Sequence, residues 1–185
     1  MIKRLIDIVL SMMALLILMP LLLITAVLIR LQDGGPSLFG QQRVGKDGRI
    51  FRMWKFRSMV INAESLGGFS TADRDPRITP IGRFVRRTSL DELPQLLNVF
   101  VGDMSIVGPR PDVPAQRSLY TEDEWMARHR VRPGITGLAQ STMRSEATTE
   151  QRKEMDLEYA NNVSLALDAR IILMTIKQVI FKGGN

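Results

Sequence analysis

The sequence predicts an α+β, mainly helical protein, in which a proline-broken membrane helix over residues 1–31 precedes a small globular domain over residues 32–185. Three observations lead to this fold class. An uncharged apolar stretch lies near the N-terminus, a pair of short β-like segments follows it, and helical patterns occupy most of the remaining chain. The helices and the hairpin together indicate one compact domain attached to an apolar segment.

The apolar stretch extends from Ile8 to Ile29 without a charged residue. As a helix it would be about 33 Å long, which matches the hydrocarbon core of a bilayer. Lys3 and Arg4 precede it, as in a secretory signal, but the stretch is too long for one and no small-residue cleavage site follows. We therefore expect a membrane segment rather than a signal peptide.

Pro20 lies near the middle of this stretch and predicts a break or bend, because proline removes a backbone hydrogen bond and clashes with the preceding turn. Basic residues flank both ends, with Lys3 and Arg4 before the stretch and Arg30 after it. The positive-inside rule draws both ends towards the cytoplasm, which favours a re-entrant helix that returns to the same face. A kinked helix that spans the bilayer remains the alternative, since proline also occurs in ordinary membrane helices.

Short elements in a regular order follow the apolar stretch. Turn residues at 32–36 end the stretch, and Gly-Lys-Asp-Gly at 45–48 predicts a hairpin turn. The predicted strands cover 37–44 and 50–59, a polar loop covers 62–77, and the predicted helices cover 81–87, 93–101, 121–130, 148–162 and 167–182. The last helix is apolar around much of its circumference, which suits either an amphipathic helix in the membrane interface or a core helix.

Composition excludes several kinds of chemistry. The chain has no cysteine and one histidine, so disulfides, thiol nucleophiles, cysteine-based metal sites and a Ser-His-Asp triad are excluded or disfavoured. The net charge of +6 suits an anionic membrane surface, a nucleic acid or a phosphorylated substrate. Nucleic acid has the least support, because no recognition motif is present and only 6% of the residues are aromatic.

Asp91 and Glu92 form the most reactive cluster, with Arg86 and Ser89 just before them. One interpretation is structural: Ser89 and Glu92 have the spacing of a helix capping box. The other is chemical: Pro94 favours a helix that begins near these acids, and a helix N-terminus attracts phosphate. Adjacent carboxylates could also hold Mg²⁺, and a carboxylate could then attack a phosphoryl group.

Four motifs resemble the bacterial monotopic phosphoglycosyl transferases, a family that starts glycoconjugate assembly on polyprenol phosphate. They are Lys-Phe-Arg-Ser-Met at 55–59, Ser-Leu-Asp-Glu-Leu-Pro-Gln-Leu-Leu-Asn-Val at 89–99, Gly-Asp-Met-Ser-Ile-Val-Gly-Pro-Arg-Pro at 102–111, and Val-Arg-Pro-Gly-Ile-Thr-Gly-Leu-Ala-Gln at 131–140. Together with the proline-containing N-terminal helix, they extend the resemblance over nearly the whole chain.

The resemblance implies transfer of a sugar 1-phosphate from a UDP-sugar to polyprenol phosphate, on the cytoplasmic face of the bacterial inner membrane. Asp91 matches the nucleophile that forms a covalent phosphosugar intermediate and lies beside Mg²⁺, and Glu92 matches its partner carboxylate. The catalytic domain would then be residues 32–185, seated on the phospholipid surface. Family positions rich in cations that bind the substrate phosphates or nucleotide correspond to Lys55, Arg57, Arg86, Arg110 and Arg144.

Two departures from the family pattern leave questions open. Where relatives often have Val-Asn-Gly-Arg, this chain has Ser-Thr-Met-Arg at 141–144, so the identity of the sugar stays open. Met19 replaces the serine that often precedes the helix-breaking proline, so the bend depends on Pro20 and its surroundings. A membrane-anchored binding protein, in which the two acids only cap a helix, is the rival interpretation, and a homodimer is also left open.

Overall fold

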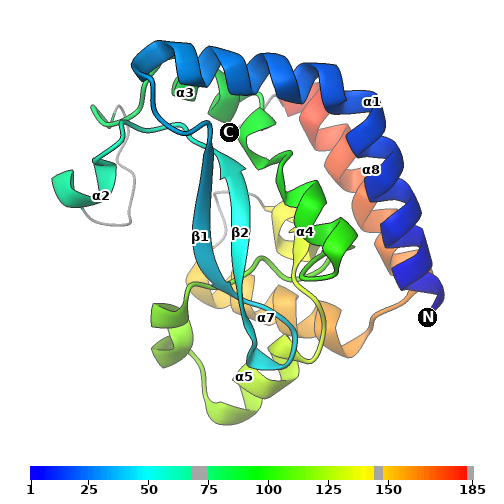
Figure 1. The fold of residues 1–185 in the computed structure, drawn as a ribbon. Helices are drawn as coiled ribbons and strands as arrows, with labels where there is room; N and C mark the ends of the chain where they lie inside the picture. Colours follow the sequence, from blue (N-terminus) through cyan, green and yellow to red (C-terminus); the bar gives the residue numbers. More distant parts are fainter. Residues whose placement is uncertain (68–74, 144–147, 183–185) are drawn as a thin grey trace.

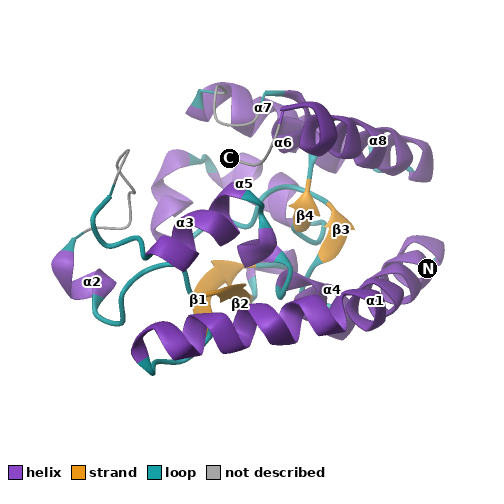
Figure 2. Ribbon diagram, turned by 90° about the horizontal axis from the view of Figure 1, so that it is seen from above, coloured by secondary structure: helices purple, strands orange, loops and turns teal. Residues whose placement is uncertain are grey.

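The structure is a computed structural model that describes residues 1–67, 75–143 and 148–182. Within these ranges helices dominate and strands are few, which confirms the α+β, mainly helical class. Figure 2 shows two small sheets between the N-terminal helix on one side and the last two helices on the other.

The N-terminal helix α1 (Ile2–Asp33) is long and apolar enough to cross a membrane, by length and composition. It is continuous, with Pro20 inside it, and bends in its middle (Figure 1). The predicted break is thus a bend, because proline removes only one of the hydrogen bonds that hold the helix together. Its central apolar side chains are exposed, Ile17 to 72% and Leu23 to 60%. The helix ends at Gly34, whose φ of 72° provides a left-handed cap.

Polar side chains attach the first turns of α1 to the globular domain. Lys3 Nζ lies 2.6 Å from Asp168 Oδ2. Asp7 is buried, and its carboxylate accepts hydrogen bonds from the Ser105 hydroxyl at 3.1 Å and the Ile106 N–H at 3.0 Å. A charged group buried in this way must be hydrogen-bonded to be tolerated. The start of α1 is therefore held tightly against the domain.

The last turn of α1 is attached to the same domain. Gln32 Oε1 accepts a hydrogen bond from the Ile81 N–H at 3.3 Å, and Asp33 forms an ion pair with Arg57. Both ends of the apolar helix therefore contact one globular unit, while the middle of the helix is bent and exposed.

The predicted hairpin is present. Strands β1 (Leu38–Val44) and β2 (Ile50–Phe56) pair antiparallel, with Leu38 opposite Phe56 and Val44 opposite Ile50. The turn between them is the short 3₁₀ helix η1 (Lys46–Gly48). In Figure 1 the hairpin begins near the end of α1 and extends away from that helix.

The five predicted helices are also present, although their ends differ by one or two residues. They are α3 (Pro80–Arg87), α4 (Gln95–Val101), α5 (Glu122–His129), α7 (Thr149–Asn161) and α8 (Leu165–Lys182). The sequence interpretation missed the helices α2 (Ala63–Leu66) and α6 (Leu138–Thr142), together with the 3₁₀ helix η3 (Pro114–Leu119). These elements are too short to produce a clear periodic pattern.

A second, parallel strand pair was also missed. Strand β3 (Ser105–Val107) pairs with β4 (Gly134–Thr136). The two backbones approach closely, since a methyl group at Gly108 would lie 2.3 Å from the carbonyl oxygen of Arg132. This pair joins the segments that carry two of the sequence motifs.

Among the described residues, two small clusters of buried hydrophobic side chains contact strand β3. Met53, Val99 and Met104 form one cluster. Val107, Tyr159 and Ile171 form the other, and Ile106 contacts both. Helix α8 thus has a core face, where Ile171 is fully buried, and an apolar exposed face, where Leu173 is 67% exposed. The buried face agrees with the core-helix alternative, and a position of the exposed face in the membrane interface stays a prediction.

Candidate active site

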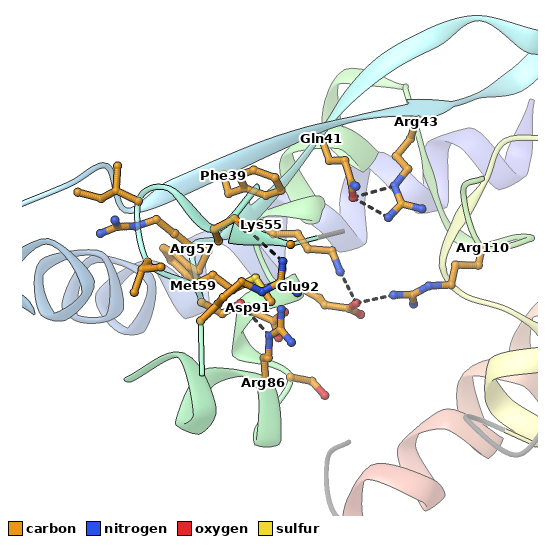
Figure 3. A pocket seen from close by; sticks show the side chains of 18 residues that line it. Phe39, Gln41, Arg43, Lys55, Arg57, Met59, Arg86, Asp91, Glu92 and Arg110 are labelled. Atoms are coloured by element: carbon orange, nitrogen blue, oxygen red, sulfur yellow. Dashed lines mark hydrogen bonds and ion pairs between the residues drawn. The ribbon is translucent and has the colours of Figure 1, made fainter. Parts of the chain in front are cut away.

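A cavity of about 720 Å³ lies between the β1–β2 hairpin, the end of β2, and the segment around Asp91 (Figure 3). Cationic side chains outnumber carboxylates in its described wall. The charged residues that line it are Arg43, Lys55, Arg57, Arg77, Arg86, Arg110, Asp91 and Glu92. Such a cavity suits an anionic ligand.

The two carboxylates are presented by a tight turn. Asp91 and Glu92 belong to the 3₁₀ helix η2 (Leu90–Glu92), which links α3 to α4. Ser89 precedes it with a φ of 57°, a left-handed conformation that is costly for a residue with a Cβ atom. The capping-box interpretation is wrong, because the Ser89 side chain makes no cap hydrogen bond and Glu92 points to other partners. Regular helix begins after Pro94, as expected.

Glu92 is bonded to two cations. Its Oε1 accepts hydrogen bonds from Lys55 Nζ at 2.8 Å and from Arg110 Nη2 at 3.0 Å. Burial raises the pKa of Glu92, but Arg110 and Lys55 outweigh burial and lower that pKa to about 2. Glu92 is therefore ionised and fixed in place at neutral pH.

Asp91 has a different environment. No other residue in the described part of the chain forms an ion pair or a side-chain hydrogen bond with its carboxylate. Burial raises the pKa of Asp91, Lys55 opposes this shift, and the negative charge of Glu92 adds to it. A partly desolvated carboxylate without a bonded cation is a suitable nucleophile or metal ligand.

The predicted phosphate-binding cations that the structure describes fall into two groups. Lys55, Arg86 and Arg110 lie around the two acids, and Arg86 Nε also donates to the Ser58 hydroxyl at 2.8 Å. Arg57 lines the same cavity, but its guanidinium points away from Asp91 and is paired with Asp33 at the end of α1 (Figure 3). Arg144 lies outside the described residues.

The loop that carries Arg110 is held by a buried ion network. Arg128 Nη2 donates to the Arg110 carbonyl oxygen at 2.8 Å and to Asp156 Oδ2 at 2.6 Å, and Arg128 Nη1 contacts Asp112. All three charged side chains are almost completely buried. The network therefore positions Arg110 beside Glu92 without itself lining the cavity.

Sequence reasoning missed Arg43 and Gln41. Both lie on β1 and line the cavity, together with Phe39. Alternate residues of a strand point to the same face, so the spacing of these three residues in the sequence predicts that their side chains share one face of the hairpin.

The arrangement of the acids fits a magnesium ion that is bound together with a phosphorylated substrate. The described residues contain no group of three or more metal-ligating side chains, so no cage made only of protein ligands is present among them. Glu92 is already neutralised by Lys55 and Arg110, which leaves the Asp91 carboxylate available. Mg²⁺ commonly binds through one or two carboxylates plus substrate phosphates. The residues present therefore fit Mg²⁺ at Asp91.

A cationic cavity around a free carboxylate, on a domain that holds both ends of an apolar helix, is the kind of site expected in a transferase of phosphorylated groups. The comparison with known families agrees with this class. The chain belongs to the bacterial sugar transferase family, whose model matches residues 1–182.

Individual relatives cover nearly the whole chain. The UDP-glucose:undecaprenyl-phosphate glucose-1-phosphate transferase of Escherichia coli is 44% identical over 98% of this chain and 40% of its own length. The UDP-N-acetylgalactosamine-undecaprenyl-phosphate N-acetylgalactosaminephosphotransferase of Aeromonas hydrophila is 43% identical over 97% of this chain and 44% of its own length. The chain thus spans less than half of these two relatives. The exopolysaccharide production protein PSS of Rhizobium leguminosarum is 45% identical over 98% of this chain and 96% of its own length.

Proposed function

We propose that this protein transfers a sugar 1-phosphate from a UDP-sugar to polyprenol phosphate, which yields polyprenyl-diphosphate-sugar and UMP. The names of the Escherichia coli and Aeromonas hydrophila relatives support this reaction, because each describes transfer of a phosphosugar to undecaprenyl phosphate. The name of the Rhizobium leguminosarum relative supports a role in starting a glycoconjugate such as an exopolysaccharide.

One observation carries the proposed mechanism: Glu92 is bonded to two cations, whereas neighbouring Asp91 is bonded to none in the described chain. In the first step an Asp91 carboxylate oxygen attacks the β-phosphorus of the UDP-sugar. The bond from that phosphorus to the bridging oxygen breaks, and UMP leaves with the electron pair. The sugar phosphate remains on Asp91 as an acyl phosphate, which divides one difficult transfer into two easier steps.

In the second step a phosphate oxygen of polyprenol phosphate attacks the same phosphorus and releases Asp91 as a free carboxylate. Lys55, Arg86 and Arg110 bind and orient the phosphate groups in both steps, and Glu92 holds two of these cations in place. When Mg²⁺ is bound at Asp91, it neutralises charge on the substrate phosphates. The protein needs no histidine for this chemistry.

The attachment of α1 supports a re-entrant membrane helix, and with it a place on the cytoplasmic face. Lys3 and Asp33 lie near opposite ends of α1, yet both are bonded to the globular domain. A straight span would carry one of these ends to the other side of the bilayer. A re-entrant α1 instead seats the domain where the nucleotide sugar arrives from water and the polyprenol phosphate arrives from lipid.

The test is detection of the covalent intermediate. The full chain in detergent or nanodiscs is incubated with Mg²⁺ and a panel of UDP-sugars, without lipid acceptor, and intact mass and UMP release are measured. One donor should add the mass of its sugar phosphate to the protein, on Asp91. Asp91→Asn should gain no mass. Asp103→Asn is the control, because the Asp103 carboxylate accepts a hydrogen bond from Asn98 and is not part of the described cavity wall, and it should behave as wild type. If the wild-type enzyme turns over that donor with acceptor but never forms the adduct, the two-step mechanism is wrong.

A further inference from the structure

Arg43 is one of the cations in the described wall of the cavity. Among the described residues it forms no salt bridge, whereas Lys55 and Arg110 share Glu92. Arg57 and Arg77 likewise have acidic partners, Asp33 and Asp75, and Arg86 is the remaining cation of the wall that has none.

The guanidinium of Arg43 is nonetheless rigidly held. Its Nε and Nη2 donate to Gln41 Oε1 at 3.2 and 2.6 Å, and its Nη1 donates to the Pro111 carbonyl oxygen at 2.8 Å. All of these acceptors are neutral, and a guanidinium carries more N–H donors than these bonds use. Burial and the nearby charge of Arg110 lower the pKa of Arg43 to about 10, so it remains charged at neutral pH. The fold therefore keeps a fixed positive charge in the wall of the cavity.

Arg43 and Arg110 lie at the same end of the cavity, and Arg57 lies at the opposite end (Figure 3). Two guanidinium groups close together repel each other, and Glu92 is already shared between Arg110 and Lys55. A phosphate group would relieve this repulsion, because a guanidinium fork matches phosphate oxygens in geometry and charge.

The direction of β1 indicates which phosphate binds there. The strand begins next to the end of α1 and runs away from it, so Arg43 lies at the far end of β1 (Figure 1). Arg43 follows Phe39 by four residues along the strand, which corresponds to about 13 Å. The end of the cavity at Arg57 is next to the apolar helix, where a lipid phosphate would enter. The end at Arg43 is remote from that helix and suits a water-soluble nucleotide.

We propose that Arg43, together with Arg110, binds the α-phosphate of the nucleotide sugar, which is the phosphate that leaves as UMP. The inference rests on the proposed function. As the bond from the β-phosphorus to the bridging oxygen breaks, that oxygen stays on the α-phosphate and gains negative charge. A positive charge at Arg43 stabilises the leaving group in this step. It plays no part in the attack of the lipid phosphate.

The experiment compares Arg43→Gln and Arg43→Lys with a control, Arg49→Gln, in the full chain. Arg49 follows the turn of the same hairpin, is exposed and does not line the cavity. Its replacement by glutamine therefore removes the same charge as Arg43→Gln but leaves the site unchanged. Three quantities are measured: inhibition by UMP, the KM for the donor, and kcat/KM for polyprenol phosphate. Thermal unfolding identifies variants that do not fold.

Arg43→Gln should raise the inhibition constant for UMP and the donor KM by at least about tenfold, because a hydrogen bond to a charged group is lost. The value of kcat/KM for polyprenol phosphate, which reports the second step alone, should stay unchanged, and Arg43→Lys should recover part of the UMP affinity because it restores the charge. Arg49→Gln should match wild type. A change in kcat/KM for polyprenol phosphate alone would mean that this phosphate site belongs to the lipid, which overturns the assignment.

A purely structural role for Arg43 predicts a different result. Loss of its bond to Pro111 would disturb the Arg110 loop, lower the unfolding temperature and affect donor and acceptor kinetics together, and lysine would not restore UMP affinity. That result, or unchanged UMP inhibition in folded Arg43→Gln, overturns the inference. In either case an adduct on Asp91 would still form, so failure here is distinguishable from failure of the proposed function.

Discussion

Lys55 on β2 and Glu92 on η2 form a 2.8 Å ion pair across the wall of the cavity, and this pair gives two adjacent acids different properties. Glu92 is ionised at neutral pH and holds Lys55 and Arg110 in place. Asp91, one residue earlier, keeps a carboxylate that is partly desolvated and unbonded to any cation in the described chain.

Asp91→Asn should lower turnover by more than about 1,000-fold, because the nucleophile is lost. It should also raise the unfolding temperature by about 2 °C or more at pH 7, since burial raises the pKa of Asp91 and the charged form therefore costs stability. This cost is present above the folded-state pKa and disappears below the ordinary value of 3.8, where the carboxyl is protonated in both states. A stability gain that is independent of pH would contradict the assignment.

The acid limb of the pH–rate profile should follow Asp91, which must be ionised to attack. Lys55 lowers the pKa of Asp91, so Lys55→Met should move the acid limb to higher pH. Glu92 raises that pKa, so Glu92→Gln should move the limb to lower pH. Both variants should be slower than wild type. Single-turnover UMP release gives the pH dependence of the first step in each variant, whatever its absolute rate. Shifts in the same direction for both would show that another group controls the limb.

Both ends of α1 should be accessible from one side of the membrane. The chain contains no cysteine, so Ile2→Cys and Pro36→Cys each introduce a unique thiol for labelling with an impermeant reagent. Gln42→Cys, on an exposed position of β1, reports the side on which the domain lies. All three should label from the cytoplasmic side of inverted vesicles. Labelling of residue 2 from the opposite side would establish a span.

Arg128→Met should destabilise the fold by about 3 kcal/mol or more, because it leaves Asp112 and Asp156 buried without their cation. Denaturant or thermal unfolding measures this loss. Adding Asp112→Asn and Asp156→Asn to the same chain should recover part of the stability, since the uncompensated charges are removed. A loss that these replacements do not reduce would indicate that packing, rather than charge, is the cause.

Removal of Mg²⁺ with a chelator should abolish turnover, and added Mg²⁺ should restore it. The unfolding temperature should stay within about 1 °C, because Lys55 and Arg110 already neutralise Glu92 and the fold needs no metal to hold it. A large decrease in unfolding temperature on chelation would point to a structural metal instead. Full activity without Mg²⁺ would show that the reaction does not need this ion.

Much of the fold was predictable from local patterns. Uncharged residues from Ile8 to Ile29 indicated the long apolar helix, and glycines around Lys46 and Asp47 indicated the hairpin turn. Periodicity located the five larger helices to within one or two residues. The parallel pair of β3 and β4 was not predictable, because each strand has three residues and its partner lies far away in the sequence.

The candidate site likewise has features that the sequence predicts and features that only the tertiary structure decides. The sequence by itself determined which residues are chemically capable, since a chain without cysteine and with one histidine must use carboxylates and cations, and Asp91 and Glu92 stand together among arginines. Only the tertiary structure decided their roles. Lys55 and Arg110 reach Glu92 from positions 37 and 18 residues away in the chain, Arg57 turns to Asp33 instead, and Arg43 enters the cavity from β1. The reason is physical: local propensity depends on neighbours in sequence, whereas pKa values and ion pairs depend on distances that exist only after the chain has folded.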